Sequence, residues 1–120
     1  MITVDSLEIN LKKVRQFCED RDWDQFHNPK DLAIGLSTEA NELLDLFRFK
    51  TETDMATMLQ NDTTRNKISH ELADILFFLL RFAQRFDFDL LDALEQKLAV
   101  NSEKYPVHQV RGSNRKYNES

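Results

Sequence analysis

Hydrophobic residues recur at helical spacing along most of the chain. Between residues 6 and 22 they lie three or four positions apart, at Leu7, Leu11, Val14, Phe17 and Cys18. This spacing places them on one face of an α-helix. Asn28 and Pro29 have the form of an N-cap and a first helical residue, which predicts a second helix that reaches about Phe49. The apolar face of this second helix consists of Leu32, Leu36, Ala40, Leu43 and Phe47.

A weaker stretch separates these two helices from a long third one. Residues 50–64 lack a strong apolar face and are interpreted as a connector, with a short turn of helix around Met55 to Leu59 and a cap-like sequence at 62–64. The third helix then continues to Phe86 and spans roughly 35 Å, at 1.5 Å per residue. Its apolar positions are Ile68, Leu72, Ile75, Leu79, Phe82, Ala83 and Phe86.

A fourth helix and a basic tail complete the chain. Residues 87–89 break the apolar pattern and can cap a helix from Leu90 to about Asn101, which Pro106 ends. The apolar positions of this helix are Leu91, Leu94 and Leu98. We therefore expect a helical domain over residues 1–105 and a basic tail over residues 106–120.

The composition agrees with an all-α fold. A chain of 120 residues is enough for one domain and too short for two. Two glycines and two prolines are too few for the tight turns of an all-β or doubly wound protein. We predict a bundle of four main helices. The phenylalanine-rich third helix carries more apolar surface than one monomer can easily hide, so self-association is expected.

Charge and segment patterns exclude several classes of partner. Sixteen Lys and Arg against 21 Asp and Glu give a net charge of −5, the wrong sign for a protein that coats a nucleic-acid duplex. The chain has no apolar run long enough to cross a bilayer and no N-terminal signal pattern, so we expect a cytoplasmic protein without a membrane partner. Cys18 is the only cysteine, and we interpret it as a small buried side chain.

Two pairs of acidic residues are the most informative feature of the sequence. Glu39 and Glu42 lie on the second predicted helix, and Glu71 and Asp74 lie on the third. Helical residues three apart point about 60° apart, so each pair presents two carboxylates on consecutive turns. If the two helices pack antiparallel, four carboxylates converge at a cost of several kcal/mol unless cations neutralise them. Mg²⁺ prefers carboxylate oxygens, waters and phosphates, and fits such a site.

Other interpretations of these acids differ in how well the residues support them. Acidic residues three apart are common on exposed helix faces, where they only solvate the surface. The protein would then be a helical interaction module, or would bind nucleotide without turnover. A zincin helix carries two histidines four residues apart, and after His70 the second position is Asp74, so this motif is excluded. A di-iron bundle is excluded as well, because the sequence has no Glu-x-x-His pair.

These motifs together resemble the all-α nucleoside triphosphate pyrophosphohydrolases of the MazG superfamily, in particular its dCTP pyrophosphatase branch. The resemblance runs from about Arg15 to Tyr117. The two acidic pairs carry it together with four further segments, namely Arg21-Asp22-Trp23-Asp24-Gln25-Phe26-His27, Lys97 with Asn101, Tyr105-Pro106, and Ser113-Asn114-Arg115-Lys116-Tyr117. The acidic signature alone is moderately specific, and its combination with the Trp23 segment and the tail is strongly specific.

The resemblance implies an enzyme that cleans the nucleotide pool. Hydrolysis between the α and β phosphates would give a nucleoside monophosphate and pyrophosphate. Glu39, Glu42, Glu71 and Asp74 would hold Mg²⁺, with Glu39 as the candidate general base, although which acid accepts the proton stays open. The family also implies a dimer or a dimer of dimers, with sites built between subunits.

Candidate substrate-binding residues follow from the same resemblance. Trp23 and His27 would lie near the base and the sugar, whereas Lys97 and Asn101 would reach the phosphates or the sugar. The tail would add three phosphate contacts, Arg111, Arg115 and Lys116.

Two aromatic positions depart from the pattern of the family. Phe49 and Phe78 stand where relatives often carry Trp and Tyr. Stacking on a base survives this change, but two hydrogen-bond donors are lost. The resemblance implies dCTP as the substrate, and because the lost donors could have set the orientation of the base, modified dCTP and dATP stay open.

Overall fold

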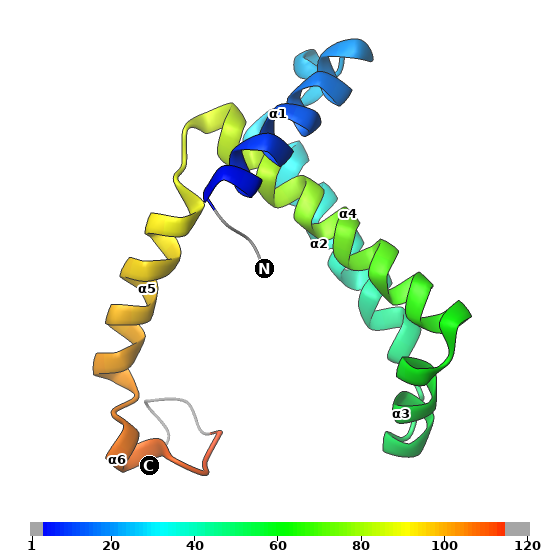
Figure 1. Cartoon of the computed structure of the whole chain (residues 1–120), viewed down its shortest axis with the longest axis vertical. Helices are drawn as coiled ribbons and strands as arrows, with labels where there is room; N and C mark the ends of the chain where they lie inside the picture. The colour runs from blue at the N-terminus through cyan, green and yellow to red at the C-terminus, as the bar shows by residue number, and fades with distance from the viewer. Residues whose placement is uncertain (1–3, 115–120) are drawn as a thin grey trace. The chain divides into compact units, whose positions relative to one another are not determined.

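The computed structural model describes residues 4–114, and the regular elements of this range are all helical (Figure 1). They are α1 (Val4–Asp20), the 3-10 helix η1 (Asp24–Phe26), α2 (Pro29–Phe47), α3 (Glu52–Gln60), α4 (Asp62–Phe86), α5 (Leu90–Lys104) and α6 (Val107–Val110). The predicted all-α class is therefore confirmed. Six α-helices occur in the described range, where the sequence predicted four main ones. None of the described helices combines the length and the apolar character that a bilayer span requires.

The chain divides into two compact units, residues 1–87 and residues 88–120. In the first unit α4 is the central helix, because α2, α1 and α3 all pack against it. The largest of these interfaces joins α2 and α4, which run side by side in opposite directions (Figure 1). This is the antiparallel arrangement on which the convergence of the acidic pairs depends.

The buried core of the first unit is small. Its buried apolar side chains are Cys18, Leu32, Ile68, Leu80 and Ala83. Cys18 is 0% exposed, which confirms that it is a small buried side chain. Burial and the neighbouring Asp24 raise the pKa of its thiol, against the opposing effect of nearby arginines.

Local sequence signals fix the start of α2 as predicted. The side chain of Asn28 accepts a hydrogen bond from the backbone N–H of Asp31 at 2.8 Å, and Pro29 is the first helical residue. The helix ends at Phe47, two residues before the expected end. Phe49 lies beyond the end of the helix, has a left-handed φ of 61° and is 90% exposed.

The connector expected at residues 50–64 contains a helix of its own. Thr51 and Asp54 form a capping box, in which each side chain bonds the backbone N–H of the other, and α3 follows for nine residues. The cap of α4 is Asn61, whose side chain accepts from two backbone N–H groups, and Asp62 is already helical. The prediction of a single turn and of a cap at 62–64 was therefore wrong by a few residues at each point.

Residues 87–89 separate α4 from α5, as predicted. Asp87 ends α4 in a left-handed conformation, with φ of 62°. Asp89 caps α5 by accepting from the backbone N–H of Asp92 at 3.0 Å.

In the second unit, α5 runs three residues past the predicted Asn101 and ends before Pro106. The tail contains the four-residue helix α6, which the sequence analysis did not predict. The division into a domain over 1–105 and a tail over 106–120 stays a prediction.

Candidate metal and nucleotide site between α2 and α4

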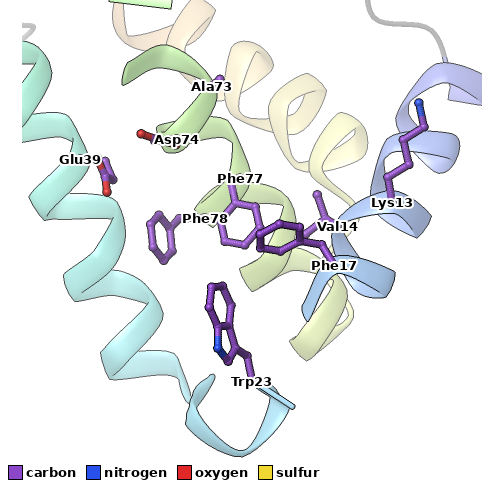
Figure 2. Close-up of a pocket in the computed structure, with 9 residues that line it drawn as sticks. All are labelled: Lys13, Val14, Phe17, Trp23, Glu39, Ala73, Asp74, Phe77 and Phe78. Carbon is purple, nitrogen blue, oxygen red and sulfur yellow. The ribbon is translucent and has the colours of Figure 1, made fainter. Parts of the chain in front are cut away.

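The acidic pairs meet where α2 and α4 lie against each other. Carboxylate oxygens of Glu39, Glu42 and Glu71 lie within 4.8 Å of one another. Asp74 lies one turn along α4 from Glu71, and its side chain faces the same space as Glu39 in Figure 2. The structure therefore gathers three of the four predicted ligands closely and brings the fourth beside them.

Glu39 and Glu71 are partly buried, whereas Glu42 and Asp74 are exposed. One oxygen of Glu39 and one of Glu71 are buried and have no hydrogen-bond partner among the described residues. A buried carboxylate oxygen without a partner is strongly unfavourable. A divalent cation that binds oxygen ligands would satisfy both oxygens. The carboxylates therefore fit a hard metal ion such as Mg²⁺.

The electrostatics of the cluster point the same way. Burial raises the pKa of Glu39 from 4.5 to about 7, and its hydrogen bond and charge repulsion with Glu42 add to the effect, followed by the charges of Asp74 and Glu71. Burial also raises the pKa of Glu71, with Glu42 as the next cause. Acids whose pKa is raised by burial and by like charges are typical of a functional site, and a bound cation would oppose this effect.

An aromatic cavity of about 510 Å³ opens beside the acids. Glu39 and Asp74 line it together with Trp23 and Phe78, two of the predicted substrate residues. The other lining residues are Lys13, Val14, Phe17, Ala73 and Phe77. Figure 2 shows the rings grouped between α1, α2 and α4, on the side of the carboxylates that faces the turn of Trp23. The site thus combines a metal-binding edge with an apolar space for a flat ring.

The rings of this cavity support one another by edge contacts. Phe17 lies 5.5 Å from Trp23 and 5.8 Å from Phe77, measured between ring centroids, and Phe77 lies 5.3 Å from Phe78. All three pairs are close to perpendicular, which is a favoured geometry for aromatic contacts. These edge contacts fix the orientation of the four rings relative to one another, and the guanidinium of Arg21 lies 3.7 Å from the centroid of Phe17.

Gly35 sets how closely Phe78 can approach α2. A Cβ atom built on Gly35 would lie 2.3 Å from Cε1 of Phe78. Real Cβ contacts are essentially never shorter than 3.0 Å, so any other residue would displace the ring. Gly35 lies one turn before Glu39, and its missing side chain places an aromatic wall next to the acids.

The turn that carries Trp23 connects α1 to α2. Asp22 adopts a left-handed φ of 55°, and the backbone N–H of Trp23 returns to the carbonyl of Cys18 at 3.0 Å. Trp23 is 37% exposed and lies 6.1 Å from the ring of His27. His27 does not line the cavity. Its Nδ1 accepts a hydrogen bond from Nε of Arg81 at 2.8 Å, and burial, then Arg81, lower its pKa.

Phe49 is not among the residues that line the cavity, and Lys97, Asn101 and Arg111 belong to the second unit. The guanidinium of Arg48 is 4.9 Å from the exposed ring of Phe49. Lys97 is exposed and Asn101 is partly buried on α5, and Arg111 is exposed after α6. Arg115 and Lys116 fall outside the described residues. The roles of these six residues stay predictions.

Sequence analysis missed several residues that shape the site. Phe17 was assigned to the apolar face of the first helix, yet it is 41% exposed and lines the cavity. Phe77 lies between Leu76 and Phe78 and was noted only as apolar surface. One local signal could have indicated the role of Gly35. Glycine is unfavourable in the interior of a helix, so its presence there suggests a packing reason.

Comparison with known proteins agrees with this geometry. The profile of the MazG-like family matches residues 34–119. dCTP pyrophosphatase 1 of Mus musculus is 38% identical over 116 residues, 93% of this chain and 68% of that protein. The Homo sapiens protein of the same name is also 38% identical, over 95% of this chain and 69% of its own length.

A solved structure shows the same fold. The crystal structure of a pyrophosphatase from Archaeoglobus fulgidus superposes with a TM-score of 0.80 and 28% identity. The match covers 88% of this chain and 97% of that one. With a family profile over more than half of its residues and relatives of 38% identity, the chain belongs to the MazG-like family, in its dCTP pyrophosphatase branch.

Proposed function

We propose that this protein hydrolyses dCTP or a base-modified dCTP between its α and β phosphates, and releases dCMP or its analogue and pyrophosphate. Its family makes it a hydrolase that acts on nucleoside triphosphates in nucleotide-pool housecleaning. One observation carries the proposal at the level of residues. Three carboxylates lie within 4.8 Å, two of them with unpartnered buried oxygens, at the edge of an aromatic cavity.

The acids are proposed to hold Mg²⁺ through Glu39, Glu42, Glu71 and Asp74. Bound there, the metal would neutralise phosphate oxygens and lower the pKa of a water. Glu39 is the candidate general base, because its carboxylate belongs both to the acidic cluster and to the lining of the cavity. Glu42 and Glu71 are close enough to exchange this role with it, so the assignment to Glu39 is tested separately below.

The cavity is proposed to select its base by stacking and shape. Its lining offers the ammonium of Lys13, the carboxylates and the indole of Trp23, but no side-chain hydroxyl or amide among the described residues. Phe78 stacks without a hydroxyl where relatives often have one. We therefore expect weak discrimination at the exocyclic groups of the base, with dATP as a poorer alternative to dCTP.

Phosphate and sugar contacts are assigned to the less buried candidates. His27 would act beside Trp23, with Phe49 as a second stacking residue. The basic or amide side chains proposed for the phosphates and the sugar are Lys97, Asn101, Arg111, Arg115 and Lys116. A triphosphate needs such cations because the acidic edge alone repels it.

A second copy of this chain is proposed as the partner, in a cytoplasmic homodimer or dimer of dimers. Leu72, Leu76 and Leu79 follow one face of α4 and are 52%, 41% and 39% exposed. A contiguous apolar stripe of this kind is typical of a buried interface. Sedimentation of the wild type against Leu76→Glu would test it, and a monomeric wild type would contradict it.

The function is tested by incubating the protein with each dNTP and with 5-methyl-dCTP in the presence of Mg²⁺ and resolving the products. The monophosphate and pyrophosphate should appear from dCTP and its analogue. Diphosphate and orthophosphate would refute the assigned bond. Nucleotide binding without product would instead favour a regulatory or sequestering module.

Three variants identify the residues. Glu42→Gln should abolish turnover and Mg²⁺ binding, whereas Glu52→Gln, an exposed acid in the first turn of α3, should retain both. Glu39→Gln should lose turnover and keep nucleotide binding if Glu39 is the base. Full activity of Glu39→Gln would move that role to a neighbouring acid.

A further inference from the structure

Arg81 is the buried charged side chain of the described residues, at 2% exposure. It lies on α4, between Leu80 and Phe82, among apolar residues. Burial of a guanidinium is expensive unless its donors are paired. Arg81 does not line the aromatic cavity, so the proposed reaction does not explain why the chain keeps it there.

The contacts of Arg81 all lead to one turn and to α1. Nε donates to Nδ1 of His27 at 2.8 Å, and one terminal nitrogen forms an ion pair with Asp24. The other terminal nitrogen donates to the side chain of Gln84 at 2.9 Å, and Gln84 donates in turn to the carbonyl of Leu11 at 2.7 Å. One guanidinium thus joins α4 to the first residue of η1 and to the residue that follows η1.

This network supplies the polar contacts between the turn of Trp23 and α4. Its turn, residues 22–27, has local backbone bonds, such as that from Phe26 N–H to the carbonyl of Trp23 at 2.9 Å. Bonds of this kind fix the shape of the turn but do not attach it to α4. The attachment comes from Arg81, with a longer bond of 3.3 Å from Arg85 to the carbonyl of Asp24.

The same contact determines how His27 carries its proton. Nδ1 accepts from Arg81, so it bears no hydrogen, and a neutral His27 must then carry its proton on Nε2. Asp24, Arg81 and Arg85 are the charged groups that act on it. Burial and the two arginines oppose a positive imidazole, and Asp24 favours one.

We propose that Arg81 is a positioning residue for nucleotide binding, which docks the Trp23 turn on α4 and holds His27 as a neutral Nε2–H donor. The proposal rests on the function proposed above, because it is the base-binding wall that Arg81 would hold in place. Its bidentate geometry matters, since a lysine can supply the charge but cannot reach His27 and Asp24 together.

Trp23 gives a direct readout, because it is the only tryptophan of the chain. The test compares Arg81→Met, which keeps the length of the side chain, with Lys67→Met, an exposed basic residue of the same helix. Asp24 is 43% exposed, so water can hydrate it when Arg81 is removed and the variant should fold. Arg81→Met should show increased acrylamide quenching and a red-shifted emission of Trp23, whereas Lys67→Met should match the wild type.

Two further measurements separate positioning from stability. The KM for dCTP should rise roughly threefold to tenfold in Arg81→Met, the equivalent of one hydrogen bond, with little change in kcat. A pH titration of Trp23 emission should place the transition of His27 below 6.5 in the wild type and closer to 6.5 in Arg81→Met. Arg81→Lys should keep the low transition and still show the raised KM.

The fluorescence and pH arms do not need activity, so they decide the proposal even if dCTP is not a substrate. A lower melting temperature with wild-type emission, quenching and KM would show a merely structural role and overturn it. An unchanged pH transition in Arg81→Met would overturn the assignment of the His27 tautomer.

Discussion

Gly35→Ala tests whether the wall beside the acids is set by backbone approach. Alanine in a helix interior is favoured over glycine by about 1 kcal/mol. In this protein the added Cβ would meet Phe78 at 2.3 Å, and an ordinary contact begins at 3.4 Å. The ring must therefore recede by about 1.1 Å, the difference of the two distances. Overpacking of this kind costs about 1–3 kcal/mol.

The two effects oppose each other, so the single variant should be between neutral and about 2 kcal/mol less stable than the wild type. Removing the ring first should reverse the sign. In a Phe78→Ala background the clash is gone, and Gly35→Ala should then stabilise the fold by about 1 kcal/mol. The double-mutant cycle should thus give a coupling energy of about 1–3 kcal/mol between the two positions.

Urea denaturation of the four proteins in EDTA measures this coupling without a contribution from bound metal. Ser37→Ala, an exposed position on the same helix, serves as a control for helix propensity alone and should stabilise by about 0.5 kcal/mol. Gly35→Ala should also raise the KM for dCTP, because Phe78 moves within the cavity. Equal stabilisation by Gly35→Ala in both backgrounds would refute the reasoning about close approach.

Three further predictions concern the acids and the caps. Glu42→Gln should raise the melting temperature in EDTA, because it removes like-charge repulsion, and should abolish the heat of Mg²⁺ binding in calorimetry; a lower melting temperature would contradict the repulsion. Burial and neighbouring acids raise the pKa of Glu39 from 4.5 to about 7, so the folded protein binds this proton more tightly than the unfolded chain. The contribution of this proton to the free energy of unfolding is complete below about pH 4.5 and lost as the pH rises through 7. In urea denaturation with EDTA, the unfolding free energy of the wild type should therefore fall relative to that of Glu39→Gln between pH 5 and 8. Parallel pH profiles of the two proteins would refute the raised pKa. Asn61→Ala removes the acceptor for two backbone N–H groups at the start of α4 and should cost about 1 kcal/mol of unfolding free energy; an unchanged denaturation midpoint would show that the cap contributes nothing.

Local sequence signals predicted several helix boundaries. Asn28 with Pro29 located the start of α2, and Asp87 with Asp89 located the break between α4 and α5. The capping box of Thr51 and Asp54 was an equally local signal for α3. It was missed because the following segment has little apolar periodicity, on which the prediction of helices depended.

The site was only partly predictable, for a different reason. Spacing within one helix predicts that Glu39 and Glu42 share consecutive turns, but the distance to Glu71 depends on how α2 and α4 are staggered. That stagger is a property of packing, and no periodicity in either helix specifies it. The same limit applies to Phe17 and Phe77, since a helical pattern cannot distinguish an apolar face in the core from one that lines a cavity.

Several unfavourable features of the first unit gather around this one cavity. Buried oxygens of Glu39 and Glu71 have no hydrogen-bond partner among the described residues, Gly35 lies in a helix interior, and Asp22 holds a left-handed conformation next to Trp23. Each would be corrected by a residue with better local propensity or packing if stability alone were at stake. Costs of independent physical origin that coincide at one place are expected where binding requires them. A cation would satisfy the acids, the glycine admits a ring, and the left-handed turn presents an indole, so the proposed metal-bound nucleotide would account for all three together, whereas a solvated acidic surface would account for none.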